Sequence, residues 1–288
     1  MEMYLSLQQD LLGKWLPPVN RPKPNSKENL MQIIKSLFIA MSVILITIGA
    51  SADNHATPST FAAQTVGCNF QSGKDIDDLR SIMDELNKWF DKNSTINYSA
   101  RLMQPIFSNV ESRTSDAMLM FFNRTFEEQG NSIDEWFSGK NGADKIHAKF
   151  VSTCGQPSQA MWFGTGVRRP ESPNNGGVTR FRVCTLEEGS SREQRNAADA
   201  AWNAELDRLG INNMGLARLW PGPGVSANVQ SGQFLSIEGV SSAAAHGANI
   251  DTFIQNSMLT KRNMIYGDLF SCSNGVLAKS EVIHSSEQ

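Results

Sequence analysis

Apolar residues along the chain recur with two alternating periods, one typical of helices and one typical of strands. The clearest helical period has apolar residues at steps of three or four, which places them on one helix face: Ile76, Leu79, Met83, Leu86 and Phe90. Shorter stretches around it alternate apolar and polar residues, as half-buried strands do. We therefore predict, in order, strand 62–70, helix 74–91, strand 95–103, strand 116–124, a short helix 131–139 and strand 145–154.

The same succession of elements occurs a second time. Segment 68–73 matches segment 184–189, since each opens with cysteine, ends with glycine and precedes an amphipathic helix that carries a tryptophan. Later in each copy, segment 130–134 matches segment 247–251. Ordered agreement at several points indicates an internal repeat. The second copy predicts strand 178–186, helix 191–209, strand 213–220, strand 232–239, helix 249–257 and strand 262–272.

The order βαββαβ, written twice, is typical of ferredoxin-like units. Such a sheet has helices on one face only, so its other face must be buried, and a second copy in the same chain is the natural partner. We therefore predict an α+β protein in which two ferredoxin-like βαββαβ repeats pack sheet to sheet as an intramolecular α+β barrel. The predicted organisation is a first repeat at 61–155, a linker at 156–177, a second repeat at 178–275 and a C-terminal tail at 276–288.

The N-terminal part of the chain predicts export. An uncharged, mostly apolar run from 37 to 48 follows Lys35 and ends in small residues, which is the pattern of a secretory signal peptide cleaved after Ala52. The run is too short for a membrane span, so we expect no stable membrane anchor, although retention as an anchor is the alternative. Residues 1–52 then comprise an upstream segment and the signal peptide, with Met31 as the expected start or, alternatively, a long polar leader. The predicted location is periplasmic or extracellular.

Charge argues against a nucleic-acid partner. The whole chain has a formal net charge of −3, and residues 53–288 carry 21 Lys and Arg against 26 Asp and Glu, a net charge of −5. This segment has no basic cluster that would neutralise phosphates. With nucleic acid disfavoured, we expect that a ligand of the predicted barrel would be a small molecule.

All four cysteines follow the predicted cleavage site, where an oxidising compartment and an even count favour disulfides. Pairing within each copy is simplest, joining Cys68 to Cys154 and Cys184 to Cys272. However, the first and fourth strands of such a sheet are antiparallel, which could separate these cysteines beyond the roughly 7 Å between Cα atoms that a bridge allows. Cross-repeat pairing therefore stays open. No cysteine or histidine spacing suggests a metal site.

The double βαββαβ pattern, with Cys-Thr-Leu-Glu-Glu-Gly at 184–189 opening a helix, resembles the dimeric α+β-barrel superfamily. That superfamily includes antibiotic-biosynthesis-monooxygenase-like, NIPSNAP-like and haem-binding chlorite-dismutase-like proteins. The resemblance covers about 61–275, and the chain resembles an exported tandem branch of the superfamily. A monomer with a pseudo-dimeric barrel is the preferred expectation, although the oligomeric state stays open. No catalytic motif carries over, and a fold alone does not confer a function. By analogy His147 or His246 is a haem ligand, but a surface role is more common for lone histidines, and we expect no cofactor.

Strand alternation divides the second copy into two faces. Apolar residues are expected to face the helices: Phe181, Val183, Leu235, Ile237, Ile265 and Leu269. More polar residues are expected to face the other copy, in the barrel lumen, and form the candidate pocket: Arg180, Arg182, Arg218, Trp220, Glu238, Tyr266 and Asp268. The matching residues of the first copy are more apolar: Gln64, Val66, Cys68, Met118, Met120 and Phe122.

Two interpretations of the candidate pocket follow. In one, Arg182 and Arg218 hold an anion or polarise a carbonyl, with Glu238 or Asp268 as a base. In the other, the charges form an ion-pair network that seals the interface. The functional prediction is an exported tandem barrel that binds a small molecule or acts as an interaction module. The alternative is a cofactor-free oxygenase- or isomerase-like enzyme with its site in the barrel lumen of the second repeat.

Overall fold

The computed structural model describes residues 59–108, 115–171, 176–225 and 232–285, which belong to one compact unit spanning 54–288. The predicted upstream segment and signal peptide, 1–52, lie outside the described residues.

The first half of this unit contains four long strands and three α-helices. They follow one another as β1 (Thr60–Cys68), α2 (Ile76–Asn93), β2 (Ser99–Phe107), β3 (Ala117–Asn123), α3 (Phe126–Phe137), a 3-10 turn (Lys140–Gly142), α4 (Ala143–Cys154) and β4 (Gln159–Arg168). The second half repeats this order with one added short strand. Its elements are β5 (Gly176–Leu186), α5 (Arg192–Arg208), β6 (Met214–Pro221), β7 (Gln233–Val240), α6 (Ala243–Gln255), α7 (Met258–Tyr266), β8 (Phe270–Cys272) and β9 (Val276–Ser285).

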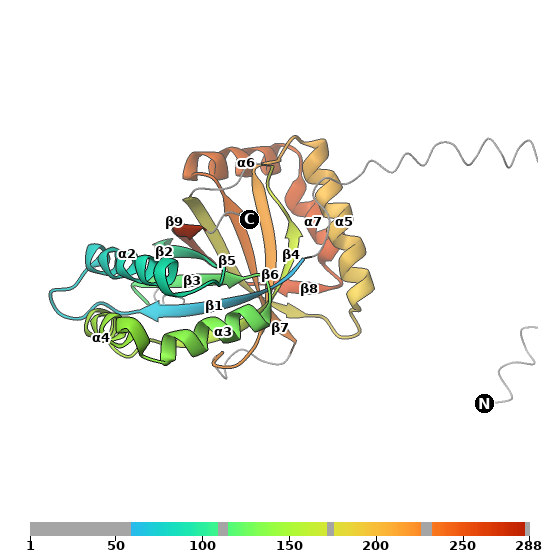
Figure 1. The fold of residues 1–288 in the computed structure, drawn as a ribbon. Coiled ribbons are helices and arrows are strands. Elements are labelled where there is room, and N and C mark those ends of the chain that lie inside the picture. The colour runs from blue at the N-terminus through green and yellow to red at the C-terminus, as the bar shows by residue number, and fades with distance from the viewer. Residues whose placement is uncertain (1–58, 109–114, 172–175, 226–231, 286–288) are drawn as a thin grey trace, which may run out of the picture. The chain divides into compact units, whose positions relative to one another are not determined.

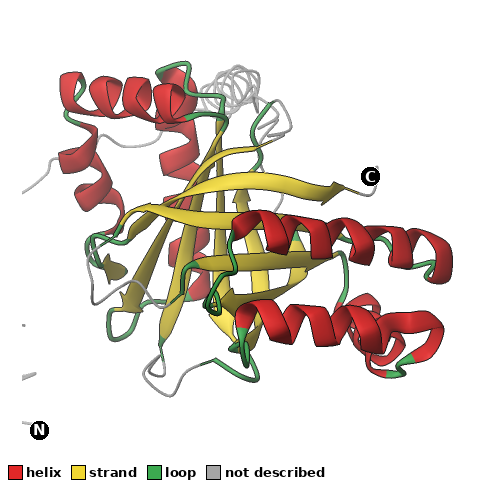
Figure 2. Ribbon diagram, turned by 90° about the vertical axis from the view of Figure 1, so that its left-hand side faces the viewer, coloured by secondary structure: helices red, strands yellow, loops and turns green. Residues whose placement is uncertain are grey.

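The strands form a closed antiparallel barrel. The first half has the sheet order β4-β1-β3-β2 and the second has the equivalent order β9-β5-β7-β6, with β8 pairing to the far end of β5. Two seams join the halves, β4 to β6 and β2 to β9, and all pairings are antiparallel. Helices cover each half from outside, α2 to α4 on one and α5 to α7 on the other (Figures 1 and 2). The predicted fold class, two ferredoxin-like units forming one α+β barrel, is confirmed.

Side-chain caps fix where the helices begin. Asp75 caps α2 by accepting from the backbone N–H groups of Asp77 and Asp78, while the Asp78 side chain accepts in return from the Asp75 N–H. Ser191 and Gln194 form the same reciprocal capping box at α5. Such caps satisfy backbone donors that have no partner within the helix.

The last strand of each half lies beyond the predicted position. Residues 145–154, predicted as a strand, form α4, and most of 262–272 forms α7 and a turn before the short β8. The true fourth strands, β4 and β9, occupy the predicted linker and the predicted tail, so the predicted boundaries at 155 and 275 are wrong. Glycines and prolines near β4 suggested a linker, but its Trp162 is buried in the barrel.

Three apolar layers stabilise the unit. One lies between the strands and helices of the first half, and a second occupies the equivalent place in the second half. The third fills the barrel interior with residues from seven strands: Ala63, Met103, Met120, Trp162, Phe181, Leu219 and Ala278. An eight-stranded barrel is just wide enough for side chains to fill it. The lumen is therefore a packed core.

This packing reverses the predicted faces of the strands in the second half, whereas Ile265 and Leu269 lie in the layer beneath the helices, as predicted. Phe181, Leu235 and Ile237 point into the barrel, whereas Cys184 and Trp220 belong to the layer beneath the helices. In the first half, Val66 and Cys68 of β1 were predicted to face the barrel lumen. That prediction is wrong, because both residues lie beneath the helices. For β3 it is right, since residues 118, 120 and 122 face the lumen. The error arose because both faces of a barrel strand are dry, so apolar character does not identify the helix side.

Both disulfides form within their own half, which was the simplest of the pairings that the sequence left open. Cys68 and Cys154 have Cα atoms 4.6 Å apart, and Cys184 and Cys272 have Cα atoms 4.0 Å apart. The geometric doubt disappears because neither partner lies on a fourth strand: Cys154 ends α4, and Cys272 lies on β8, directly opposite Cys184. The four cysteines are all bonded.

Candidate functional site

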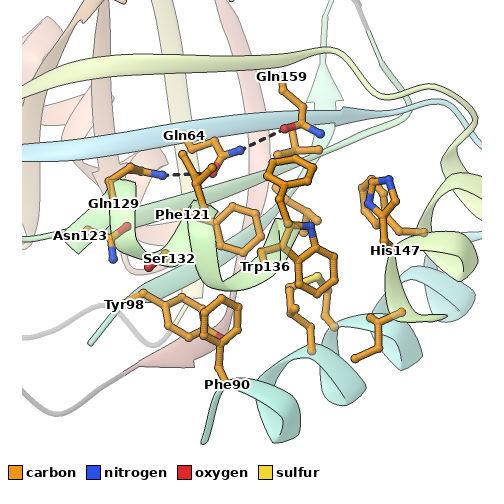
Figure 3. Close-up of a pocket in the computed structure, with 18 of the residues that line it drawn as sticks. Gln64, Phe90, Tyr98, Phe121, Asn123, Gln129, Ser132, Trp136, His147 and Gln159 are labelled. Carbon is orange, nitrogen blue, oxygen red and sulfur yellow. Dashed lines mark hydrogen bonds between the residues drawn. The ribbon is translucent and has the colours of Figure 1, made fainter. Parts of the chain in front are cut away.

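A cavity of about 100 Å³ lies in the first half, between strands β1 and β3 and helices α2, α3 and α4. Figure 3 shows its walls. Aromatic and aliphatic side chains make up most of them: Val66, Ile82, Met83, Leu86, Phe90, Leu119, Phe121, Ile133, Trp136, Phe137, Ile146 and Phe150. The cavity therefore offers a small apolar space beneath the helices, outside the barrel lumen.

Three glutamines form a chain of side-chain hydrogen bonds along one side of the cavity (Figure 3). Gln129 Nε2 donates to Gln64 Oε1 at 3.0 Å, and Gln64 Nε2 donates to Gln159 Oε1 at 3.2 Å. The chain leads from Gln159, which is exposed, to Gln129, which is only 1% exposed. Gln129 Oε1 is buried and has no hydrogen-bond partner among the described residues.

Helix α3 places a second buried oxygen beside this chain. Thr125 caps α3 by accepting from the Glu128 N–H, and Gln129 and Ser132 follow three residues apart, on one face of the helix. The Ser132 Oγ is also buried without a partner in the described part of the chain. Polar atoms buried in this way are uncommon in folded proteins, and each calls for an explanation.

The remaining polar groups around the cavity are engaged. The Tyr98 hydroxyl donates to Asn87 Oδ1 at 2.8 Å, and Asn123 Nδ2 donates to the Asn97 carbonyl at 3.2 Å. Burial, helped by the charge of Asp91, raises the pKa of Tyr98 well above its ordinary value, so its hydroxyl stays neutral.

The cavity wall carries no fixed charge. Among the lining residues that the structure describes there is no Lys, Arg, Asp or Glu, and the titratable ones are Tyr98 and His147. His147 lies on α4, not on a strand as predicted, and its ring contacts Trp136 and Phe137 at centroid distances of 6.0 and 6.3 Å. The cavity is therefore suited to a neutral occupant, because burying an unpaired charge is costly.

Four of the seven candidate residues predicted in the second half, Arg182, Arg218, Glu238 and Tyr266, form two clusters on the helix side of its sheet instead of in the lumen. Arg218 forms a two-pronged ion pair with Asp199 of α5, including Nη1 to Oδ2 at 2.6 Å, and the Tyr266 hydroxyl donates to the same carboxylate at 2.9 Å. Arg218 also lies over the rings of Phe234 and Phe270. Asp199 completes this cluster and was not predicted, although it precedes Trp202 by three residues on the buried face of α5.

A second cluster joins Arg182 to Glu238 at 3.6 Å, with both side chains 8% exposed. Burial, followed by the like charge of Arg262, lowers the pKa of Arg182 to about 10. His246 Nδ1 lies 4.0 Å from Glu238. The charges are therefore largely paired, but the network joins helices to the sheet of one half and does not seal the two halves together.

Three predicted pocket residues stand apart from these clusters. Arg180 is partly exposed and its Nη2 donates to the Asn274 carbonyl, while Asp268 is exposed. Trp220 packs on Phe234 and beneath the Arg195 guanidinium. The predicted set is therefore divided among separate places on the helix side of the second sheet.

The cavity itself was missed by sequence reasoning. A usable signal existed: residues 129, 132, 133 and 136 share one face of α3, which is the face expected to be buried, yet two of them are polar. In the described residues no group of three or more His, Cys, Asp and Glu is placed to hold a metal ion. Nor is any helix in that part of the chain both long enough and apolar enough to cross a membrane.

Fold and cavity define a class of protein: a single-chain α+β barrel of two ferredoxin-like units, with a small cavity between one sheet and its helices. Solved structures agree with this class. A monooxygenase-like protein from Lactobacillus acidophilus matches with a TM-score of 0.53 at 7% identity, over 80% of this chain and 97% of the other. The predicted resemblance to dimeric α+β barrels is confirmed at the level of the fold.

Two further solved structures match at lower similarity. A monooxygenase-like protein from Fusobacterium nucleatum has a TM-score of 0.48 at 6% identity, over 81% of this chain and 96% of that one. A chlorite dismutase from Candidatus Nitrospira defluvii has a TM-score of 0.43 at 9% identity, over 79% and 93%. No family model and no curated protein sequence matches the chain.

Proposed function

We propose that the protein binds a small, neutral, largely apolar molecule in the cavity of its first half. The observation that carries this proposal is an apolar cavity of about 100 Å³ between the first sheet and its helices, with aromatic and aliphatic walls and a chain of three glutamines along one side. Ligand sites commonly combine apolar walls with a few placed polar atoms in this way.

The size of the cavity limits the ligand. An engineered cavity of about 150 Å³ in another protein holds one benzene molecule, so a space on the order of 100 Å³ suits one small ring or a short branched chain. Because the cavity wall has no charged residue among those described, a ligand's carboxylate or ammonium group would be buried without a partner, and such ligands are therefore excluded. The expected ligand class is therefore a single-ring or similarly small neutral compound.

We also propose that this binding takes place outside the cytoplasm. Two intact disulfides in the barrel unit support this location, because disulfides persist in oxidising compartments. N-terminal sequencing of protein released by the native host tests it: cleavage after Ala52 is expected, and an intact leader on cell-associated protein would contradict it.

The enzymatic alternative, a cofactor-free oxygenase or isomerase, stays a prediction. Its intended site in the lumen holds packed apolar side chains. Of the charged residues assigned to it, Arg182, Arg218 and Glu238 lie on the helix side of the second sheet, and Asp268 is exposed. An enzymatic reaction would have to use another part of the molecule.

Thermal unfolding in the presence of small neutral aromatics tests the binding proposal. Toluene and phenol at millimolar concentration should raise Tm of the wild type, because a ligand that binds only the folded state stabilises it. Ile133→Trp should abolish the shift by filling the cavity, whereas Ile254→Trp, the same change at a position 65% exposed on α6, should retain it. A shift that survives in the Ile133 variant, or no shift in the wild type, would refute the proposal.

A further inference from the structure

We propose that the Cys184–Cys272 disulfide is a site of thiol–disulfide exchange, at which a small external thiol attacks the sulfur of Cys272. The two disulfides of the barrel unit have different surroundings. Cys68, Cys154 and Cys184 are at most 2% exposed, whereas Cys272 is partly exposed and both of its chain neighbours are exposed. Since exposed disulfides are the more labile ones, Cys272 is the sulfur that a thiol reaches first.

The strand that carries Cys272 is short and lies at an edge. β8 has three residues and, among the described strands, pairs with β5 alone, where Cys184 lies directly opposite Cys272. The other disulfide starts from Cys68 on β1, a long strand with a neighbour on each side. A small group added to Cys272 can therefore be accommodated by a shift of β8, without opening the barrel.

A positive charge lies beside the sulfur that would be attacked. Arg262 is on α7, and its Nη2 lies 3.9 Å from Cys272 Sγ. A guanidinium at this distance attracts an incoming thiolate and stabilises the negative charge that spreads over the sulfurs during the exchange. After reduction, the same charge favours the thiolate form of Cys272, which is the reactive form of a cysteine.

The exchange takes place in two steps. The external thiolate forms a bond to Cys272 Sγ, and the bond from Cys272 Sγ to Cys184 Sγ breaks. Its electron pair stays on Cys184, which takes up the proton that the external thiol released, and this thiol lies 3.8 Å from the Arg182 carbonyl oxygen, which can accept its hydrogen. A second external thiol then attacks the mixed disulfide and leaves Cys272 as a thiolate. In total, two external thiols are oxidised to a disulfide and the protein disulfide is reduced.

Other contacts hold β8 while the disulfide is open. The Ser273 N–H donates to the Val183 carbonyl at 2.9 Å. The Phe270 ring packs against those of Phe234 and Tyr266, with centroid distances of 5.2 and 4.9 Å. The exchange therefore needs no unfolding of the barrel unit, and the disulfide can form again from the folded dithiol.

Reduced glutathione, added to the full oxidised protein without denaturant, tests this proposal. An alkylating agent then blocks the free thiols, and peptide mass spectrometry identifies the state of each cysteine. We expect Cys184–Cys272 to open at least about tenfold faster than Cys68–Cys154, with glutathione attached to Cys272 and with unchanged far-ultraviolet circular dichroism. Equal rates, a faster opening of Cys68–Cys154, attachment to Cys184, or no opening until denaturant is added would each refute the proposal.

Variants of one arginine test the part played by its charge. Arg262→Gln should slow the opening several-fold, and Arg262→Lys should retain most of the rate because it keeps the positive charge. Arg124→Gln makes the same neutralising change at an exposed position of the first half and should leave the rate unchanged. An unchanged rate in Arg262→Gln would contradict the role of the charge. If that variant fails to fold, the relative rates of the two disulfides in the wild type still decide the question.

Discussion

At the level of single residues, some buried polar groups pair with one another and others do not, and both kinds include residues of the second half, where Arg182 Nε and Asn203 Oδ1 have no described partner. In the second half, Arg218, Asp199 and Tyr266 satisfy one another beneath α5 and α7. In the first half, Gln129 and Ser132 keep buried oxygens without described partners beside a cavity. Removing one member of a paired buried network is usually strongly destabilising. The paired residues Arg218, Asp199 and Tyr266 are therefore suited to a structural role.

Both tyrosines of the barrel unit should resist ionisation. Burial is the main cause that raises the pKa of Tyr98 and of Tyr266, and nearby Asp91 and Asp199 add to it. A group whose pKa is higher in the folded than in the unfolded state contributes stability in full below the unfolded value, about 10, and this stability is lost as pH rises above it. The protein should therefore become less stable to denaturant above about pH 10.

Absorbance at 295 nm checks this expectation in protein cleaved after Ala52, where Tyr98 and Tyr266 are the two remaining tyrosines. Their ionisation should coincide with the loss of far-ultraviolet circular dichroism. Tyr98→Phe should weaken the alkaline decline in stability. Reversible ionisation of both tyrosines near pH 10 in folded protein would contradict the burial argument.

At the level of elements, the sequence predicted the first helix and the first three strands of each half well, because their apolar periods are strong. It misassigned α4, where residues 146, 150 and 154 recur every four positions but neighbouring residues also fit a strand. It missed β4, because Pro157, Pro170, Pro173 and the run Asn174-Asn175-Gly176-Gly177 on either side of it are typical of a linker. Local pattern could not show that the residues between them pair with β1 and β6.

Gly164 has a packing role in β4. It lies directly across from Phe61 on β1, and a Cβ built on it would come 2.2 Å from the Phe61 ring. We expect Gly164→Ala to lower the free energy of unfolding by about 1–3 kcal/mol through overpacking. Phe61→Leu in the same chain should recover part of the loss. Gly247→Ala, at a helical glycine with no atom within 4 Å of its added Cβ, serves as the control in urea unfolding.

At the level of the whole barrel unit, the order of elements was sufficient to predict two ferredoxin-like sheets. It was not sufficient to assign the faces, because the barrel interior and the helix layers are equally apolar. Nor did it identify the seams, in which β4 and β9 each pair with a strand of their own half and one of the other. These features depend on closure of the sheet, which no local window contains. The cavity was missed for the same reason, because Gln64 and Val66, which line it, were assigned to the barrel lumen.

Truncation tests the importance of the second seam. A chain ending at Gly275 lacks β9 and leaves β2 and β5 with open edges, which are templates for association between chains. We expect this chain to aggregate or to bind a hydrophobic dye, as measured by size-exclusion chromatography and dye fluorescence. A chain ending at residue 285 keeps all of β9 and should behave as the wild type. A soluble, folded monomer ending at Gly275 would contradict this role.

The position of β9 also determines when the molecule can mature. Ribosomes make β2 early, but its neighbour Ser280 is made only after the other strands of the unit, so the barrel cannot close before β9 has been synthesised. Pairings between such distant segments form slowly, and the waiting edges of β2 and β5 expose unpaired backbone groups. If the chain is exported as we propose, β9 is the last strand of the unit to cross the membrane, and the edges of β2 and β5 stay open until it arrives.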